Sequence, residues 1–146
     1  MTRILFLLLI ALPLLASQPV FADDGTETVL INVNSDQGQV QGMAMELATK
    51  LVQADKEVRI VLCGDAAELA LEENIPSSLR PRDVSPKEMM LEAVSLGATV
   101  QVCHLFLPNT RFGQYDEDDL VEDASVISAE ELAELVTKSE IRRFSY

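Results

Sequence analysis

Cysteine and histidine are scarce in this sequence. It contains two cysteines, Cys63 and Cys103, and a single histidine, His104. Two cysteines are too few for the dense disulfide framework of many small secreted domains, so we expect the fold to rest on a hydrophobic core. There is no Cys-x-x-Cys pair and no cluster of histidines, which disfavours a metal site formed by these residues.

The motifs of several large enzyme classes are also missing. The chain has no glycine-rich phosphate loop, no Gly-x-Ser-x-Gly elbow and no dinucleotide-binding fingerprint after its first predicted strand. The turn "NSDQGQ", which contains Asp36, has one glycine and is compatible with binding an anion or with capping the next helix. We therefore look to the two cysteines for chemistry, and the sequence predicts neither a cofactor nor a resident metal.

Basic residues are strongly outnumbered. The 146 residues include 11 lysines and arginines against 24 acidic residues, which gives a formal net charge of −13. Such a surface repels nucleic acid and anionic lipid head groups, so we expect neither as a partner. It permits basic partners, although strong acidity is also a common solubility feature of exported proteins.

Only one long apolar run occurs, and it lies at the amino terminus. It extends from Ile4 to Leu15, follows Arg3, and precedes the small-residue site Val20-Phe21-Ala22. This layout predicts a signal peptide over residues 1–22 that is cleaved after Ala22. A membrane-spanning helix is the alternative, but the run is shorter than the ~20 residues that a span requires. We expect a chain of one domain, residues 23–146, that is periplasmic or otherwise exported and has no membrane association after cleavage.

The rest of the sequence alternates between strands and helices. Short branched apolar segments predict strands, and segments with helical periodicity or capping signals predict helices. The expected strands are 29–33, 58–63, 99–103, 124–127 and 141–146, and the expected helices are 39–53, 66–71, 85–96 and 128–138. This order predicts an α/β fold: a three-layer α/β/α domain with a mainly parallel sheet of about five strands.

Local signals place the ends and faces of these helices. Ser85 and Ser128 begin capping boxes, and Gly97 is positioned to end the helix before it. In the helix over 39–53, Val40, Ala44, Leu47 and Leu51 form the expected buried stripe, with Met43 near it and Met45 pointing elsewhere. Core packing explains these methionines better than metal binding does.

Polar and reactive residues follow the first three predicted strands. They are Asp36 after the first, Cys63 and Asp65 after the second, and Cys103 and His104 at the third. The carboxyl ends of parallel strands meet at one edge, where ligands bind and where helix amino termini favour anions such as thiolates. Asp65 either orients a ligand or caps the following helix, and His104 or Arg111 can supply positive charge near Cys103.

Three stretches carry a resemblance to a known family. They are "VRIVLCGDAAELAL", "SPKEMMLEAVSLGATVQVC" and "DLVEDASVISAEELAEL". The chain from about Thr28 to Tyr146 resembles the DsrE/DsrF-like family, which includes the TusD-type sulfur carriers. The resemblance implies a three-layer α/β/α domain, self-association, and a persulfide on Cys103 exchanged with a donor or acceptor protein. Whether such a protein acts as a sulfurtransferase or only as a carrier stays open. Unlike the usual cytoplasmic carriers, this chain is predicted to be exported.

Three hypotheses for Cys103 follow. The first is that its thiolate accepts a sulfane sulfur and passes it on. The second is a disulfide with Cys63, either structural or redox-active, which requires the second and third strands to be adjacent. The third is a soft-metal or small-ligand site formed by Cys63, Cys103 and His104, a ligand set that suits copper(I).

Overall fold

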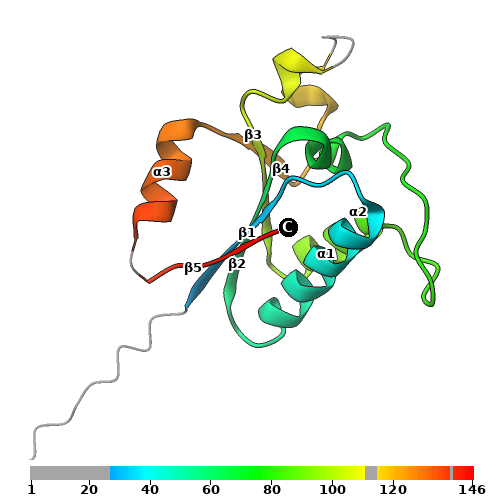
Figure 1. The fold of residues 1–146 in the computed structure, drawn as a ribbon, viewed down its shortest axis with the longest axis horizontal. Coiled ribbons are helices and arrows are strands. Elements are labelled where there is room, and N and C mark those ends of the chain that lie inside the picture. Colours follow the sequence, from blue (N-terminus) through cyan, green and yellow to red (C-terminus); the bar gives the residue numbers. More distant parts are fainter. Residues whose placement is uncertain (1–26, 111–114, 139) are drawn as a thin grey trace, which may run out of the picture.

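The computed structural model describes residues 27–110, 115–138 and 140–146, which form a five-stranded parallel sheet between two layers of helices (Figure 1). The predicted signal peptide and Arg111 lie outside these residues. The strands stand in the order β4-β3-β2-β1-β5, and all four neighbouring pairs are parallel. Their bounds are Thr28–Val33 (β1), Glu57–Leu62 (β2), Thr99–Cys103 (β3), Ala124–Ile127 (β4) and Arg142–Ser145 (β5). The predicted three-layer α/β/α fold is confirmed.

The helices cover the two faces of the sheet unequally. On one face lie α1 (Gly38–Val52), α2 (Pro86–Ser95) and the 3₁₀ helix η1 (Gly64–Ala70), and α3 (Ala129–Thr137) covers the other face (Figure 1). Two further short 3₁₀ helices, η2 (Leu107–Asn109) and η3 (Glu117–Asp119), follow β3 in the chain. Within the described residues, no helix has the length and apolar content that a membrane crossing requires.

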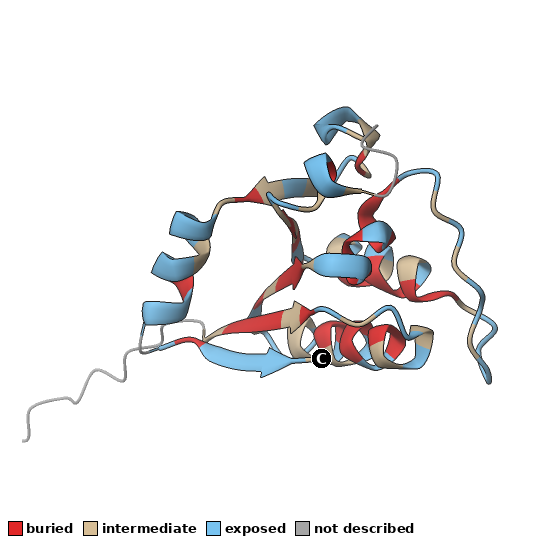
Figure 2. Ribbon diagram, turned by 45° about the horizontal axis from the view of Figure 1, so that its top comes forward, coloured by how far each residue is buried: buried red, intermediate tan, exposed pale blue. Residues whose placement is uncertain are grey.

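Alternation along each strand divides the core. On β1, Val29, Ile31 and Val33 face α1 and α2, whereas Leu30 faces α3. The cluster on the α1 and α2 side contains most of the buried apolar residues, and the cluster under α3 is much smaller. Figure 2 shows the same asymmetry, with α3 largely exposed and the buried faces of α1 and α2 turned toward the sheet. Parallel sheets are usually buried on both faces, and here the α1 and α2 side buries more apolar residues than the α3 side.

Capping residues set the helix ends as predicted. Ser85 Oγ accepts a hydrogen bond from Glu88 N at 3.2 Å, and Ser85 N donates to the Glu88 carboxylate at 2.7 Å. The corresponding distances between Ser128 and Glu131 are 3.1 and 2.8 Å. Gly97 follows α2 with φ of 116°, a left-handed conformation that suits glycine and ends the helix.

The predicted buried stripe of α1 is rotated from the observed one. Met45 is fully buried, Met43 is exposed, and Leu47 and Leu51 are only partly buried. The buried face also includes Gln41, whose amide donates to the Ser35 carbonyl at 2.9 Å. The prediction considered only the spacing of apolar residues, and it was wrong because the buried face of α1 also contains polar residues and a glycine.

Differences at the strand ends matter for the site. The strands over 99–103 and 124–127 coincide with prediction, whereas β2 ends at Leu62, one residue before Cys63. The short helix predicted over 66–71 is a 3₁₀ helix that begins at Gly64. Cys63 therefore belongs to the turn that leaves the sheet, while Cys103 is the last residue of β3.

Candidate functional site

The two cysteines meet at the carboxyl ends of neighbouring strands. Strands β2 and β3 pair in parallel with Leu62 opposite Val102, so Cys63 and Cys103 come next at the same level. Their Cα atoms are 5.1 Å apart and their sulfurs form a disulfide, at a separation within the range that disulfides require. The second and third strands are adjacent, which is the condition that the disulfide hypothesis required, and the Cys63–Cys103 pairing is present.

Backbone hydrogen bonds hold both cysteines at this edge. Cys63 N donates to the Val33 carbonyl at 3.0 Å, which keeps Cys63 attached to β1 after β2 has ended. The Cys103 carbonyl accepts from Phe106 N at 2.8 Å, which turns the chain immediately after β3. Gly64 has φ of 56° and redirects the chain into η1. Both cysteine residues are half-buried, and they pack against the smaller core cluster on the α3 side of the sheet.

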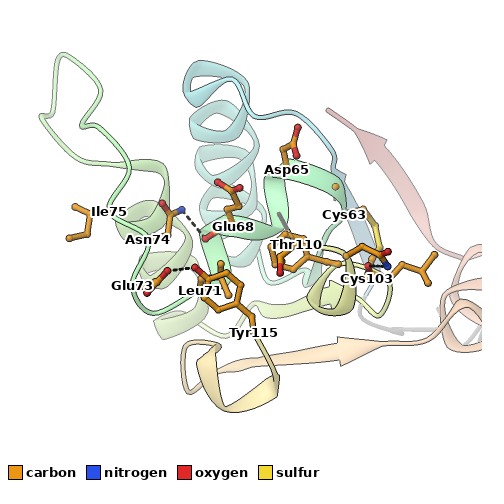
Figure 3. A pocket seen from close by; sticks show the side chains of 14 residues that line it. Cys63, Asp65, Glu68, Leu71, Glu73, Asn74, Ile75, Cys103, Thr110 and Tyr115 are labelled. Atoms are coloured by element: carbon orange, nitrogen blue, oxygen red, sulfur yellow. Dashed lines mark hydrogen bonds between the residues drawn. A yellow bond between two sulfur atoms is a disulfide. The ribbon is translucent and has the colours of Figure 1, made fainter. Parts of the chain in front are cut away.

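The disulfide forms part of the wall of an open cleft with a volume of about 1050 Å³ (Figure 3). Four apolar side chains line it, namely Leu71, Ile75, Leu105 and Phe106. The remaining lining residues are polar, acidic or glycine, namely Gly64, Asp65, Glu68, Glu73, Asn74, Asn109, Thr110 and Tyr115. The walls come from η1, the segment after it, and the segment that follows β3.

Lys87 of α2 supports one wall of the cleft. Its Nζ donates to the carbonyls of Leu71, Glu72 and Asn74 at 2.6, 2.8 and 3.0 Å. Burial lowers the pKa of Lys87, and the negative charge of Glu72 partly opposes this effect. Asn74 Nδ2 donates to the Glu68 carbonyl at 2.8 Å, which binds the same wall to η1.

Tyr115 links two segments that are distant in sequence. Its hydroxyl donates to the Glu73 carboxylate, a contact that joins the chain before η3 to the wall after η1 (Figure 3). The hydrogen bond to Glu73 and, to a lesser extent, burial and nearby carboxylates raise the pKa of Tyr115, because ionisation would break the bond and place two negative charges together. The phenol is therefore a neutral donor at the cleft.

Among the described residues, the charged side chains that line the cleft are all acidic. Asp65, Glu68 and Glu73 contribute carboxylates, and no lysine, arginine or histidine among the described residues lines the cleft. The ion pairs between described side chains lie elsewhere, for example between Arg82 and Glu92 at 3.0 Å. We expected helix amino termini at this edge of the sheet to favour an anion such as a thiolate. The negative charges of these carboxylates oppose that effect.

The predicted site residues separate into two groups. Cys63, Cys103 and Asp65 line the cleft, whereas His104 and Asp36 are exposed and do not. Asp65 does not cap η1, because Cys63 occupies the N-cap position and no side chain caps that end. The Asp36 carboxylate likewise does not cap α1; Ser35 Oγ accepts from Gln37 N at 3.1 Å.

Sequence reasoning missed most of the cleft. Glu73, Ile75 and Tyr115 lie in segments without a periodic pattern, and Glu68 lies in a short predicted helix; only the fold brings them together. Leu105 offers a signal, because a large apolar residue two positions after the strand-end Cys103 lies beyond the sheet and so is available to line a surface cleft.

The soft-metal hypothesis is not supported by this arrangement. The two sulfurs bind each other, and His104 lies outside the cleft. Across the described ranges, no group of three His, Cys, Asp or Glu side chains is arranged to hold a metal ion.

The sequence matches no known family model and no curated protein. The resemblance to the DsrE/DsrF-like family stays a prediction.

Proposed function

We propose that this protein exchanges electrons with thiols through the Cys63–Cys103 disulfide. The observation that supports this most directly is the position of the disulfide, half-buried in the wall of an open cleft. Disulfides that an incoming thiol can reach include the labile, regulatory and catalytic ones, whereas structural disulfides resist reduction. The cleft provides access for an incoming thiol and a surface on which it can be held.

The reaction is a two-step exchange. A thiolate of the partner attacks one sulfur of the pair, a mixed disulfide forms, and the other sulfur leaves as a thiolate that takes a proton from solvent. A second thiol of the partner then attacks the mixed disulfide. The products are an oxidised partner and the reduced Cys63–Cys103 pair, so two electrons pass from the partner to this protein.

Reduction of the folded protein tests the proposal. The purified protein is equilibrated with graded mixtures of reduced and oxidised dithiothreitol, free thiols are alkylated, and the masses are measured. We expect the pair to be reduced without unfolding, at a potential above about −300 mV. A disulfide that opens only when the chain unfolds would show a structural role and overturn the proposal.

A second candidate is the persulfide carrier that the resemblance implies. It is favoured by the position of Cys103, which lies in the cleft wall and is the residue on which the resemblance depends. After reduction, the Cys103 thiolate attacks the sulfane sulfur of a donor persulfide, and the donor leaves as a thiolate. The Cys63 thiolate can then attack the Sγ atom of the Cys103 persulfide. This step reforms the Cys63–Cys103 disulfide and releases the outer sulfur as hydrosulfide.

Two serine variants test this candidate. Cys63→Ser is expected to gain one sulfur atom on Cys103 from a sulfane donor and to keep it at least about tenfold longer than the reduced native protein, which holds a resolving thiol beside it. Cys103→Ser is expected to gain none at position 103. Mass spectrometry over time measures both. Equal gain by the two variants, or equal lifetimes, would remove the carrier from consideration.

Export and self-association belong to the same proposal. A disulfide persists in an oxidising compartment such as the periplasm, which agrees with the predicted signal peptide. Mass spectrometry of the protein recovered after export is expected to show a chain beginning at Asp23, and sedimentation is expected to show more than one copy. A chain that keeps residues 1–22, or a monomer at all concentrations, would contradict the respective part.

A further inference from the structure

We infer that the cleft receives an extended segment of a partner protein in which a cysteine is flanked by basic and apolar residues. The inference rests on the proposed exchange at Cys63 and Cys103 and names the class of partner. The reactive pair and the docking surface belong to one cavity, because both cysteines line it together with the apolar and acidic side chains.

Exposed apolar side chains mark the cleft as a docking surface. Ile75 is 92% exposed and Leu105 is 63% exposed, and these are the highest values for large hydrophobic residues within the described ranges. Both line the cleft. Scattered exposed apolar residues are ordinary, but two that share a cavity with a disulfide indicate a surface that a partner covers.

The extent of the cleft fits a polypeptide better than a small thiol. Its volume of about 1050 Å³ is at the upper end for small-molecule sites. In Figure 3 the disulfide and Ile75 lie at opposite ends of the group of lining side chains, with Glu68 and Leu71 between them. A single small thiol reaching the sulfurs would leave the Ile75 end uncovered, whereas an extended segment spans both.

The negative charge of the cleft determines which residues can flank the cysteine of the partner segment. Asp65 and Glu68 line it, and none of the ion pairs between described side chains involves either carboxylate. Glu73 accepts the Tyr115 hydroxyl, and this neutral donor leaves the carboxylate charge uncompensated. Basic residues on the partner complement these charges, whereas acidic residues, and anionic thiols such as glutathione, are repelled.

The exchange reaction itself provides the test. Two synthetic peptides are compared, each with one cysteine and two leucines, the first with two lysines and the second with two glutamates. The measured quantity is the rate of mixed-disulfide formation with the oxidised full-length protein. We expect the lysine peptide to react at least about tenfold faster at low ionic strength, and the ratio to shrink as salt is added.

Matched variants separate the cleft from the overall negative charge. In Asp65→Asn/Glu68→Gln the ratio of the two rates is expected to fall toward one. In Glu46→Gln/Glu134→Gln, which removes the same charge from exposed positions on α1 and α3, the ratio should be retained. Ile75→Ser/Leu105→Ser should slow both peptides several-fold, whereas Met43→Ser, an exposed apolar residue of α1, should slow neither.

The outcomes distinguish this inference from the proposed function. If dithiothreitol fails to open the disulfide in the folded protein, the exchange function fails and the inference falls with it. The inference alone is overturned if dithiothreitol opens the disulfide but the two peptides react at equal rates. It is also overturned if the ratio of the two peptide rates falls equally in the cleft double variant and in the control double variant. If cysteamine, a small cationic thiol, matches the lysine peptide in rate and in its dependence on Ile75 and Leu105, the partner is not a polypeptide segment.

Discussion

Gly64 controls how the chain leaves the sheet next to Cys63. Its φ of 56° lies in the left-handed region, which costs a residue with a Cβ roughly 1–2 kcal/mol. A Cβ built there would meet only the Asn34 carbonyl, at 3.8 Å, an ordinary contact. The requirement for glycine is therefore conformational, and it maintains the turn on which the direction of the Cys63 side chain depends.

We expect Gly64→Ala to lower the free energy of unfolding by about 1 kcal/mol. Urea denaturation of the oxidised protein measures the change. Gly38→Ala is the matched control, because Gly38 begins α1 and its Cβ would lie 3.7 Å from Leu79, an ordinary contact. Alanine there should be neutral or slightly stabilising. Equal losses in the two variants would show that backbone conformation at Gly64 is not the cause.

At the scale of elements, the capping boxes of α2 and α3 couple helix stability to pH. The pKa of Glu88 is lowered by its hydrogen bonds to the Ser85 backbone and side chain, and the pKa of Glu131 is lowered in the same way by Ser128. A carboxylate whose pKa is lower in the folded state stabilises the fold above its ordinary value of 4.5. That contribution is lost as the pH falls through the lowered pKa.

We expect Glu88→Gln/Glu131→Gln to flatten the acid dependence of stability. Glutamine still serves in a capping box but does not titrate, so the variant should lose less stability than the native chain between about pH 5 and about pH 2. Urea midpoints across this range measure the difference. A remaining slope is expected from Glu27 and Glu57, whose pKa values are also lowered. If the variant and Glu46→Gln show the same slope as the native chain, the two boxes are not the source.

Lys87 is the link between α2 and the cleft wall. We expect Lys87→Met to remove about 1–3 kcal/mol of stability, because three backbone carbonyls lose a charged donor. Amide hydrogen exchange should accelerate mainly at 71–75, next to those carbonyls. Lys50→Met, an exposed change on α1, is the control. Uniform acceleration throughout the chain would indicate general destabilisation instead of a released wall.

At the scale of the whole molecule, the Cys63–Cys103 disulfide cross-links two distant parts of the chain. It joins positions 40 apart in sequence, which the loop-entropy model values at about 3–4 kcal/mol. We expect Cys63→Ala/Cys103→Ala to lose about that much in urea denaturation, with a larger m-value because the unfolded chain is less compact. The reduced native protein should show the same loss of stability and the same increase in m-value as the double variant. A double variant as stable as the oxidised protein would show that the cross-link does not stabilise this fold.

The general fold could be predicted because its signals are local. Strands such as 99–103 and helices such as α2 follow from short apolar runs, serine caps and Gly97, and their alternation indicates a parallel sheet. The rotation of α1 could not be predicted, since burial of Gln41 depends on a bond to Ser35 that periodicity does not encode. The 3₁₀ character of η1 was likewise not readable from composition.

The site was predictable only in part. The position of Cys63 and Cys103 at one edge follows from the predicted parallel strands, whereas their pairing depends on the adjacency of β2 and β3, which the order of elements along the chain does not fix. The cleft does not follow, because Glu73 and Tyr115 meet across 42 positions and Lys87 fixes a segment through its backbone carbonyls, which no residue pattern reveals. His104 stood out in the sequence, yet it lies outside the cleft.

Parallel strands give this molecule two unlike ends. Thr28 begins β1 at one edge of the sheet, whereas Tyr146 lies near the opposite edge, its N–H donating to Asn32 at 2.9 Å and its carbonyl accepting from Asn34 at 2.8 Å. The cysteines share the second edge. A tether or fusion partner attached ahead of Thr28 would therefore leave from the end of the strands away from the disulfide, whereas one attached after Tyr146 would leave from the end that carries it.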